Sequence, residues 1–399
     1  MFPAARRTTL LLHAGFVLTG VVTTLLGPVL PALTEKWSID DAQAGYLFTA
    51  QFAGSIAGVI ASSRMMARFG SRGALASGFA LASAGVAGLG ASPWIAGIAC
   101  VFMYGTGLGL TIPTTNLLIS EANPNRRAAA LNVLNFAWGI GAVASPPIIG
   151  PLARRSTLWP LLALAALVAA VALWLARSSL DAAGGNSGQA VDERQSARRP
   201  FLTPFLLLLG AMAFFYVGTE NALGGWVATY ALRFDPAGRS SWAAVPSVFW
   251  GALLAGRIMT PIFLRHISGE KLSLAGLAVA LAGVALLLAG TTLRGLLAST
   301  FLAGLGLASV FPNALATMSE RFGSSASRAA GVVFTLAGLG GAIIPWLVGI
   351  VSISFGSLRL GLAVALLSGL AMAALQLAII LALPRPNGAH GRKGGSAGR

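Results

Sequence analysis

Twelve stretches of the sequence are apolar for about 20 residues each, and this feature constrains the fold more than any other. A helix of that length crosses the hydrocarbon core of a bilayer, because each helical residue adds about 1.5 Å. The composition agrees, with 56% hydrophobic and 10% charged residues. The sequence therefore predicts an all-α membrane protein with transmembrane helices at roughly 9–33, 43–63, 73–92, 95–119, 128–150, 158–176, 202–231, 244–264, 272–292, 294–318, 328–351 and 358–383.

The second half of the sequence repeats the first. Glycines, prolines and one glutamate recur in a fixed order, as Gly105-x-Gly107, Pro113, Glu121, Gly139-x-Gly141 and Pro146. The same series follows 199 residues later, as Gly304-x-Gly306, Pro312, Glu320, Gly338-x-Gly340 and Pro345. Two homologous halves of this kind place a solute site near mid-membrane, between the halves, where it opens alternately to either side.

The repeat divides the chain into four parts. Residues 1–176 form an N-terminal six-helix half and residues 201–384 a C-terminal six-helix half. Between them, 177–200 is rich in Gly, Ser and Arg without hydrophobic periodicity, which is typical of a linker. Residues 385–399 have the composition of a disordered tail.

Positive charge is distributed unevenly among the loops. Of the 27 Lys and Arg residues, 19 fall in the segments that share a side with the N-terminus. Loops of this kind stay in the cytoplasm, so we expect a multi-pass protein of the cell inner (plasma) membrane with both termini and the linker in the cytoplasm. The same distribution accounts for the net charge of +16 without any nucleic acid partner.

The sequence also lacks the motifs of several function classes. A Walker motif, paired catalytic carboxylates and a Ser-His-Asp arrangement are all absent, and Cys100 is the one cysteine. We therefore expect no enzyme, no metal and no cofactor beyond a coupling proton or sodium ion. The expected partners are the lipid bilayer and a small-molecule solute, and the expected working unit is a monomer.

One carboxylate lies deep in an apolar stretch. Glu220 sits within 202–231, where an ionised group costs several kcal/mol unless it is paired, faces water or takes a proton. It is either a structural carboxylate satisfied by a neighbouring helix or a site for a proton, cation or polar solute, and we favour the second. Arg257 is the one deep cation, and it either reaches Glu220 or points away, snorkelling to the cytoplasmic side or capping backbone carbonyls. If it points away, Glu220 would titrate by itself.

Amide and aromatic side chains near mid-membrane are further candidates for the binding site. Amides bond sugar hydroxyls bidentately and an indole covers the apolar face of a sugar ring. Alternatively, the amides bond neighbouring helices as structural contacts. The candidates are Gln51, Asn116, Asn132, Asn135, Trp138, Tyr216, Asn221, Trp226, Trp250 and Asn313, with His13 as a possible relay for protons. The glycine pairs Gly139-x-Gly141, Gly338-x-Gly340 and Gly224-Gly225 suit close packing or bending of helices.

The arrangement of two six-helix halves around a cytoplasmic linker resembles the major facilitator superfamily across essentially the whole chain. That family carries a loop signature after its second helix, roughly Gly-x-x-x-Asp-Arg-x-Gly-x-Arg. Here the loop spans Ser63 to Arg72, and its Arg68, Gly70 and Arg72 match the signature. Arg64 is a further arginine of this loop. Ser63 and Ala67 replace the glycine and the acid, so the resemblance does not extend to the gating ion pair made by that acid.

Within the superfamily, the segment Tyr216–Trp226 is similar to the seventh helix of fucose:proton symporters and sodium-dependent glucose transporter-like proteins. Asn135 with Gly139-x-Gly141 is similar to the same branch. The resemblance implies uptake of a monosaccharide driven by a proton or sodium gradient, with Glu220 near the sugar or the ion. The acidic first-helix residue of fucose-type symporters is absent from 9–33, so coupling would fall on Glu220.

The predicted function is therefore a secondary transporter of a small polar solute, with a monosaccharide as the first solute class. The alternative is a proton-driven exporter of drugs or other amphipathic compounds, since an apolar cavity with a single acid suits lipophilic cations.

Overall fold

The computed structural model describes residues 3–177, 202–234 and 241–382, which are helical apart from short turns and contain no strand. The first half comprises α1 (Pro3–Thr23), α2 (Leu26–Trp37), α3 (Asp41–Ala91), α4 (Trp94–Ala122), α5 (Arg127–Arg155) and α6 (Leu158–Arg177). The second half comprises α7 (Pro204–Phe234), η2 (Ser241–Ala243), α8 (Ala244–Phe263), α9 (Gly269–Ala289), α10 (Leu293–Leu307), α11 (Val310–Phe322), η3 (Gly323–Ser325), α12 (Ala326–Ser354) and α13 (Leu358–Ala382). The predicted linker 177–200 and tail 385–399 lie almost entirely outside these residues.

Ten of the described helices are long and apolar enough to cross a membrane, and the bent pair α1 and α2 adds an eleventh span. At 51 residues, α3 is too long for one crossing, since about 20 residues suffice. It is kinked at Gly70, whose φ of 70° and ψ of 172° suit glycine because it lacks a Cβ. Divided there, α3 supplies two spans, and the predicted twelve-helix architecture is confirmed.

Two predicted spans are broken into two helices each. The first span divides into α1 and α2, bent by 43°, and the tenth divides into α10 and α11. Pro28 and Pro312 each lie in the first turn after the break. A proline has no N–H for the carbonyl four residues earlier, so a helix is interrupted where it stands.

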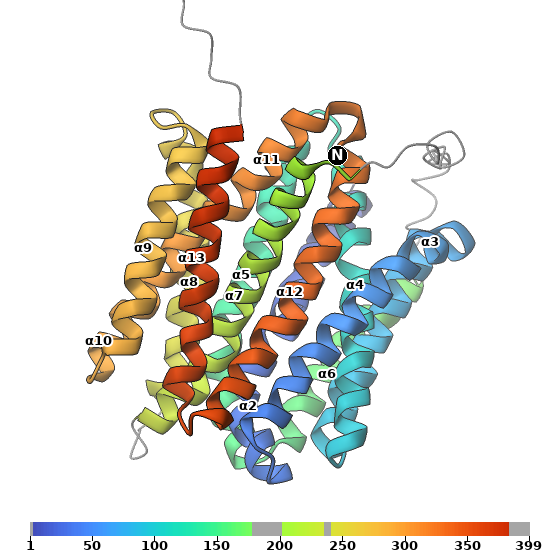
Figure 1. Ribbon diagram of the computed structural model, residues 1–399. Coiled ribbons are helices and arrows are strands. Elements are labelled where there is room, and N and C mark those ends of the chain that lie inside the picture. Colours follow the sequence, from blue (N-terminus) through green and yellow to red (C-terminus); the bar gives the residue numbers. More distant parts are fainter. Residues whose placement is uncertain (1–2, 178–201, 235–240, 383–399) are drawn as a thin grey trace, which may run out of the picture.

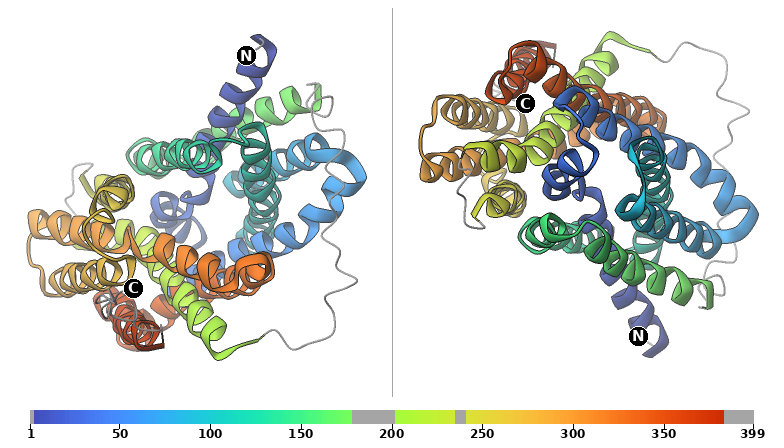
Figure 2. Two further views of the ribbon diagram at one scale, coloured as in Figure 1. Left: turned by 90° about the horizontal axis from the view of Figure 1, so that it is seen from above. Right: turned by 90° about the horizontal axis from the view of Figure 1, so that it is seen from below.

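The helices run side by side in one bundle, with α3, α4 and α6 at one edge and α9, α10 and α13 at the other (Figure 1). Seen along the bundle, first-half helices gather on one side and second-half helices on the other (Figure 2). We call the end at which α1 and α7 begin and α13 ends the linker side, and the opposite end the far side. The internal repeat of the sequence thus appears in space as two bodies.

Equivalent glycines hold each half together. A Cβ at Gly141 of α5 would overlap the carbonyl oxygen of Val17 in α1, and one at Gly340 of α12 would overlap that of Phe214 in α7. Small residues let helix backbones approach closely in a membrane, so these positions of the repeat specify packing. At Gly224-Gly225, where the sequence allowed the helix to open, α7 continues as one unbroken helix. Gly225 instead makes room for the ring of Phe48.

Candidate functional site

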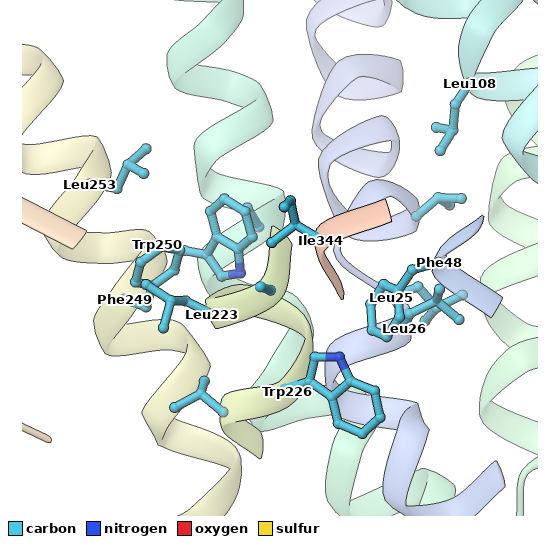
Figure 3. Close-up of a cluster of buried hydrophobic side chains, with 14 of the residues drawn as sticks. Leu25, Leu26, Phe48, Leu108, Leu223, Trp226, Phe249, Trp250, Leu253 and Ile344 are labelled. Atoms are coloured by element: carbon cyan, nitrogen blue, oxygen red, sulfur yellow. The ribbon is translucent and has the colours of Figure 1, made fainter. Parts of the chain in front are cut away.

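The two halves pack against each other on the far side through apolar side chains. The rings of Phe48 in α3 and Trp226 in α7 lie 5.8 Å apart, and Thr49 Oγ1 donates to the carbonyl of Ala342 in α12 at 2.9 Å. Figure 3 shows Leu26 and Phe48 of the first half together with Trp226 and other apolar side chains of the second. This cluster separates the middle of the bundle from the far side.

An ionic contact lies beyond this cluster, nearer the far side. Arg233 at the end of α7 donates from Nη1 and Nη2 to the two carboxylate oxygens of Asp41 at 2.7 and 2.5 Å. Ser352 of α12 donates to the same carboxylate at 2.6 Å, and Asp41 is only 4% exposed. We call these three residues the far-side latch, because Asp41 belongs to the first half and its partners to the second.

Toward the linker side the halves part. Phe52 and Ile56 of α3 contact Gly341 and Gly338 of α12, but Ile60, one turn further along the same helical face, is 61% exposed. On α12, Phe334 continues the face of Gly338 and is 50% exposed. Residues four apart share a helix face, so these exposed side chains look toward the opposite half. The space between the halves is therefore open on the linker side.

The α5 and α8 pair shows the same opening. Gly139 of α5 meets Leu254 of α8, whereas Asn135 and Ile258, one turn nearer the linker side on the same faces, are exposed. Because the helices are antiparallel, Asn135 lies at about the depth of Arg257. The amide thus faces the open space on one wall while the guanidinium lies on the other.

Glu220 and Arg257 meet near the closed end of this opening. Arg257 Nη2 donates to Glu220 Oε1 and to the hydroxyl of Tyr216, each at 3.2 Å. Glu220 is buried, and the side chain of Arg257 is 29% exposed. Of the alternatives left open by the sequence, the structure thus has Arg257 reaching the carboxylate.

Aromatic rings flank this pair. The rings of Tyr216 and Phe311 of α11 are stacked at 5.2 Å with 15° between their planes, and Phe334 meets Phe311 edge-on at 6.2 Å. Phe311 is the second residue of α11, just after the break between α10 and α11. Phe311 was not among the residues that the sequence singled out, although it adjoins Pro312 of the repeat series.

Three buried donors near the pair have no hydrogen-bond partner among the described residues: Thr219 Oγ1, Trp250 Nε1 and Arg257 Nε. Trp250 packs against Gly224 of α7 and lies edge-on to Trp138 of α5 at 5.7 Å. All three donors lie on the neighbouring stretches of α7 and α8. Buried donors without partners cost free energy, and a water or solute bound between α7 and α8 would supply the missing acceptors.

Three predicted site residues are engaged in structural hydrogen bonds. Gln51 bonds the carbonyl of Thr23 at 3.0 Å and the hydroxyl of Tyr104 at 2.8 Å, within the first half. Trp226 donates to the carbonyl of Pro345 at 2.8 Å. Asn313 bonds the carbonyl of Gly269 and the hydroxyl of Ser273 on α9. Their polar groups are occupied, which agrees with the structural alternative.

The remaining amides differ in their freedom to bind a ligand. Asn116 and Asn221 each donate to a carbonyl of their own helix, four residues earlier. Asn132 and Asn135 are exposed and make no hydrogen bond with the described residues. Trp138 lies one turn from Asn135 and donates weakly to Thr23 Oγ1 at 3.4 Å. His13 bonds the carbonyl of Thr9 in its own helix.

The predicted gating loop lies on the linker side. Gly70 forms the kink of α3, and Arg68 lies over the ring of Phe69 at 5.2 Å. Arg64 is exposed, and Arg72 is partly buried.

The comparisons with known proteins agree with this architecture. The family model described as Major Facilitator Superfamily matches residues 12–345. The glucose/mannose transporter GlcP of Bacillus subtilis is 24% identical over 86% of this chain and 88% of its own length. The sodium-dependent glucose transporter 1A of Mus musculus is 20% identical over 85% of this chain and 88% of its own length. The 4-hydroxybenzoate transporter PcaK of Pseudomonas aeruginosa is 31% identical, over 43% of this chain and 39% of its own.

Solved structures show the same fold. A bacterial homologue of the human lysosomal transporter Spinster, in an inward-facing and occupied conformation, aligns with a TM-score of 0.78 at 15% identity, covering 96% of this chain and 98% of its own. A D-xylose-proton symporter aligns with a TM-score of 0.73 at 17% identity, covering 92% of this chain and 97% of its own. The transporter FucP, in the outward conformation, aligns with a TM-score of 0.61 at 17% identity, covering 93% of this chain and 98% of its own.

Proposed function

Because the chain belongs to the Major Facilitator Superfamily, a family of membrane transporters and not of enzymes, we propose that it moves a small polar solute coupled to a proton or sodium ion. The mechanism is alternating access, in which two homologous halves rock about one site between them. The linker side, which carries most of the positive charge, is the cytoplasmic side in this proposal. The described conformation then faces inward, with the far-side latch closed.

The observation that carries the proposal is the position of the Glu220–Arg257 pair. It joins the middle of α7 to the linker-side half of α8, where the far-side contacts end and the open space begins. A proton on Glu220 would abolish its charge and release Arg257 from the pair. Solute and ion thus meet at Glu220, whose charge state changes the contact between α7 and α8.

The first solute class that we propose is a monosaccharide. Two relatives aligned over most of their length are named as glucose transporters, and Asn135 with Trp138 offers an amide beside an indole on the wall facing Arg257. PcaK, aligned over less than half of its length, is named for a carboxylate solute, so carboxylates belong in the panel of ligands as well. The exporter alternative loses support, because Arg257 compensates the negative charge that would attract a lipophilic cation.

The test is uptake of radiolabelled solutes into proteoliposomes of the purified protein under an inward proton or sodium gradient. We expect gradient-dependent uptake of at least one solute in the wild type and loss of its gradient dependence in Glu220→Gln. Uptake by the variant that still follows either gradient as in the wild type would refute Glu220 as the coupling group. Beforehand, thermal stabilisation selects the solutes, since a ligand at 100 times its Kd stabilises by about 2.7 kcal/mol.

A further inference from the structure

The guanidinium of Arg257 is only partly used by its neighbours. Both hydrogen bonds that it makes leave from one nitrogen, Nη2, and both are 3.2 Å long. Its Nε is buried without a partner among the described residues. A guanidinium has five N–H donors in a planar fork that matches a carboxylate bidentately, and Nε–H lies on the same edge of the fork as Nη2. This edge is therefore only half used while Nη2 bonds Glu220 and Tyr216.

The chain itself shows what a completed pair looks like. In the far-side latch, Arg233 presents two nitrogens to both oxygens of Asp41, at 2.7 and 2.5 Å, and Ser352 adds a third bond. Bidentate contacts of this kind are the strong form of the interaction. Arg257, by contrast, holds Glu220 by one oxygen and leaves Nε without an acceptor among the described residues.

The surroundings of this half-used edge are donors and rings. Thr219 and Trp250 contribute two more buried donors without partners, and no unpartnered buried carboxylate or amide oxygen accompanies them among the described residues. The stacked rings of Tyr216 and Phe311 lie beside the guanidinium. A site composed of spare donors and an unpaired Nε–H calls for a molecule rich in acceptors, above all an anion.

We propose that the transported solute carries a carboxylate, which binds Nε and Nη2 of Arg257 once protonation of Glu220 has released Nη2 from the pair. This inference rests on the proposed function, because it takes the Glu220–Arg257 pair as the transport site, and it narrows the solute to monocarboxylates. A sugar acid and an aromatic acid both satisfy it. The first would use Asn135 for its hydroxyls, and the second would use the rings of Phe311 and Phe334.

Charge balance then provides the coupling. The ionisable side chains around Glu220 are Tyr216 and Arg257, while α11 and α12 bring the uncharged Phe311 and Phe334. The empty site, with Glu220 ionised, has no net charge. A proton alone leaves an uncompensated cation and a carboxylate alone leaves an uncompensated anion, and both are unfavourable in a low-dielectric site. Proton and carboxylate together restore neutrality, so they bind and leave together, one of each.

A neutral hexose would not be coupled in this way, because it offers no charge to replace that of Glu220. The inference therefore separates transport of a sugar acid from transport of a neutral sugar. For the sugar acid it requires that one proton moves with each solute, so that no net charge crosses the membrane. Uptake would follow a pH gradient but not a membrane potential.

The test uses matched pairs of solutes that differ in the carboxylate. Thermal stabilisation and proteoliposome uptake are measured for glucuronate against glucose and for benzoate against benzamide. We expect the acid of one pair to bind and the neutral compound of that pair not to bind. Which of the two acids binds then shows whether the solute is a sugar acid or an aromatic acid. In Arg257→Lys the acid should bind roughly 10- to 150-fold more weakly, the range for hydrogen bonds to charged groups.

Two controls keep the outcome unambiguous. Arg359→Lys alters another arginine that bonds a tyrosine hydroxyl, that of Tyr230, but lies away from the site, so it should bind the acid like the wild type. In Glu220→Gln the carboxamide imitates the protonated acid, so carboxylate binding should persist and lose its dependence on pH. Equal binding of acid and neutral partner, or undiminished binding in Arg257→Lys, would overturn the carboxylate inference while leaving transport intact. Absence of any uptake in a folded wild type would overturn both proposals.

Discussion

Two arginine–carboxylate pairs of the molecule differ in every respect that matters for function. Asp41–Arg233 joins the two halves, is bidentate and has Ser352 as a third member. Glu220–Arg257 lies within one half, has a single 3.2 Å contact between the partners and leaves Nε unbonded among the described residues. The first pair is complete and fixes a conformation, whereas the second is incomplete and leaves room for a ligand. Pairing alone therefore does not distinguish a structural ion pair from a functional one, but completeness does.

The largest effect should come from breaking the complete pair. Arg233→Ala leaves the buried carboxylate of Asp41 with only Ser352, and we expect it to destabilise the far-closed conformation by about 3 kcal/mol, the lower end for a buried pair because Arg233 is half exposed. Spin labels at Ser38 and Phe355, on far-side ends of the two halves, should report a new population at longer distance.

An unchanged distance distribution in Arg233→Ala would show that the apolar cluster around Trp226 holds the far side closed without the latch. The control is Trp226→Phe, which keeps a ring in the cluster and leaves the latch intact. This variant should therefore keep the wild-type distances.

Breaking the incomplete pair should have a smaller effect on stability and a larger one on coupling. Glu220→Gln leaves the Arg257 cation without its counterion, but the carboxamide oxygen still accepts from Nη2 and the guanidinium side chain is 29% exposed. We therefore expect a loss of about 1–2 kcal/mol in free energy of unfolding. The measurement is thermal unfolding in detergent beside pH-dependent uptake. A destabilisation as large as that of Arg233→Ala would erase the distinction between the pairs.

Tyr216→Phe sharpens the comparison within the incomplete pair. The variant removes one of the two acceptors of Arg257 Nη2 and keeps the stacking on Phe311, so we expect about 1 kcal/mol of destabilisation. Proton coupling should persist, because Glu220 is intact. Uptake under a pH gradient checks this, and its loss would assign a coupling role to the tyrosine hydroxyl.

The smallest effect belongs to a third pair, Arg154–Glu35, which spans 3.8 Å at the surface of the first half. Exposed pairs of this length contribute about 0–1 kcal/mol. Arg154→Ala should therefore change neither the spin-label distances nor the midpoint of thermal unfolding by a measurable amount. Any shift comparable to that of Arg233→Ala would show that surface charge, and not the latch, sets the conformation.

Some of the site could be predicted from the sequence and some could not. Glu220 and Arg257 are recognisable because a charge within an apolar span is costly and therefore conspicuous. Asp41 is not conspicuous, since an aspartate at the start of a helix is ordinary. Its partners lie 192 and 311 residues away in the chain, and only the packing of the two halves brings them to it.

The amides illustrate the same limit. Gln51, Asn313 and Asn135 look alike in the sequence, each an amide within an apolar span. The first two have neighbouring backbone and hydroxyl groups to bond, and Asn135 faces the opening between the halves. Whether an amide is bonded to a neighbouring helix or faces the opening depends on the polar groups of the adjacent helix. The local sequence around the amide does not contain that information.

The sequence by itself determined the number of spans, the two-fold repeat and the position of the deep charges, because these follow from the length and polarity of contiguous segments in a bilayer. The tertiary structure decided that Arg257 reaches Glu220 and leaves its Nε unpaired among the described residues, that Asp41 locks the far side and that Gly224 and Gly225 of α7 pack against Trp250 and Phe48. These features depend on distances between side chains of different helices, which are set only when the helices pack.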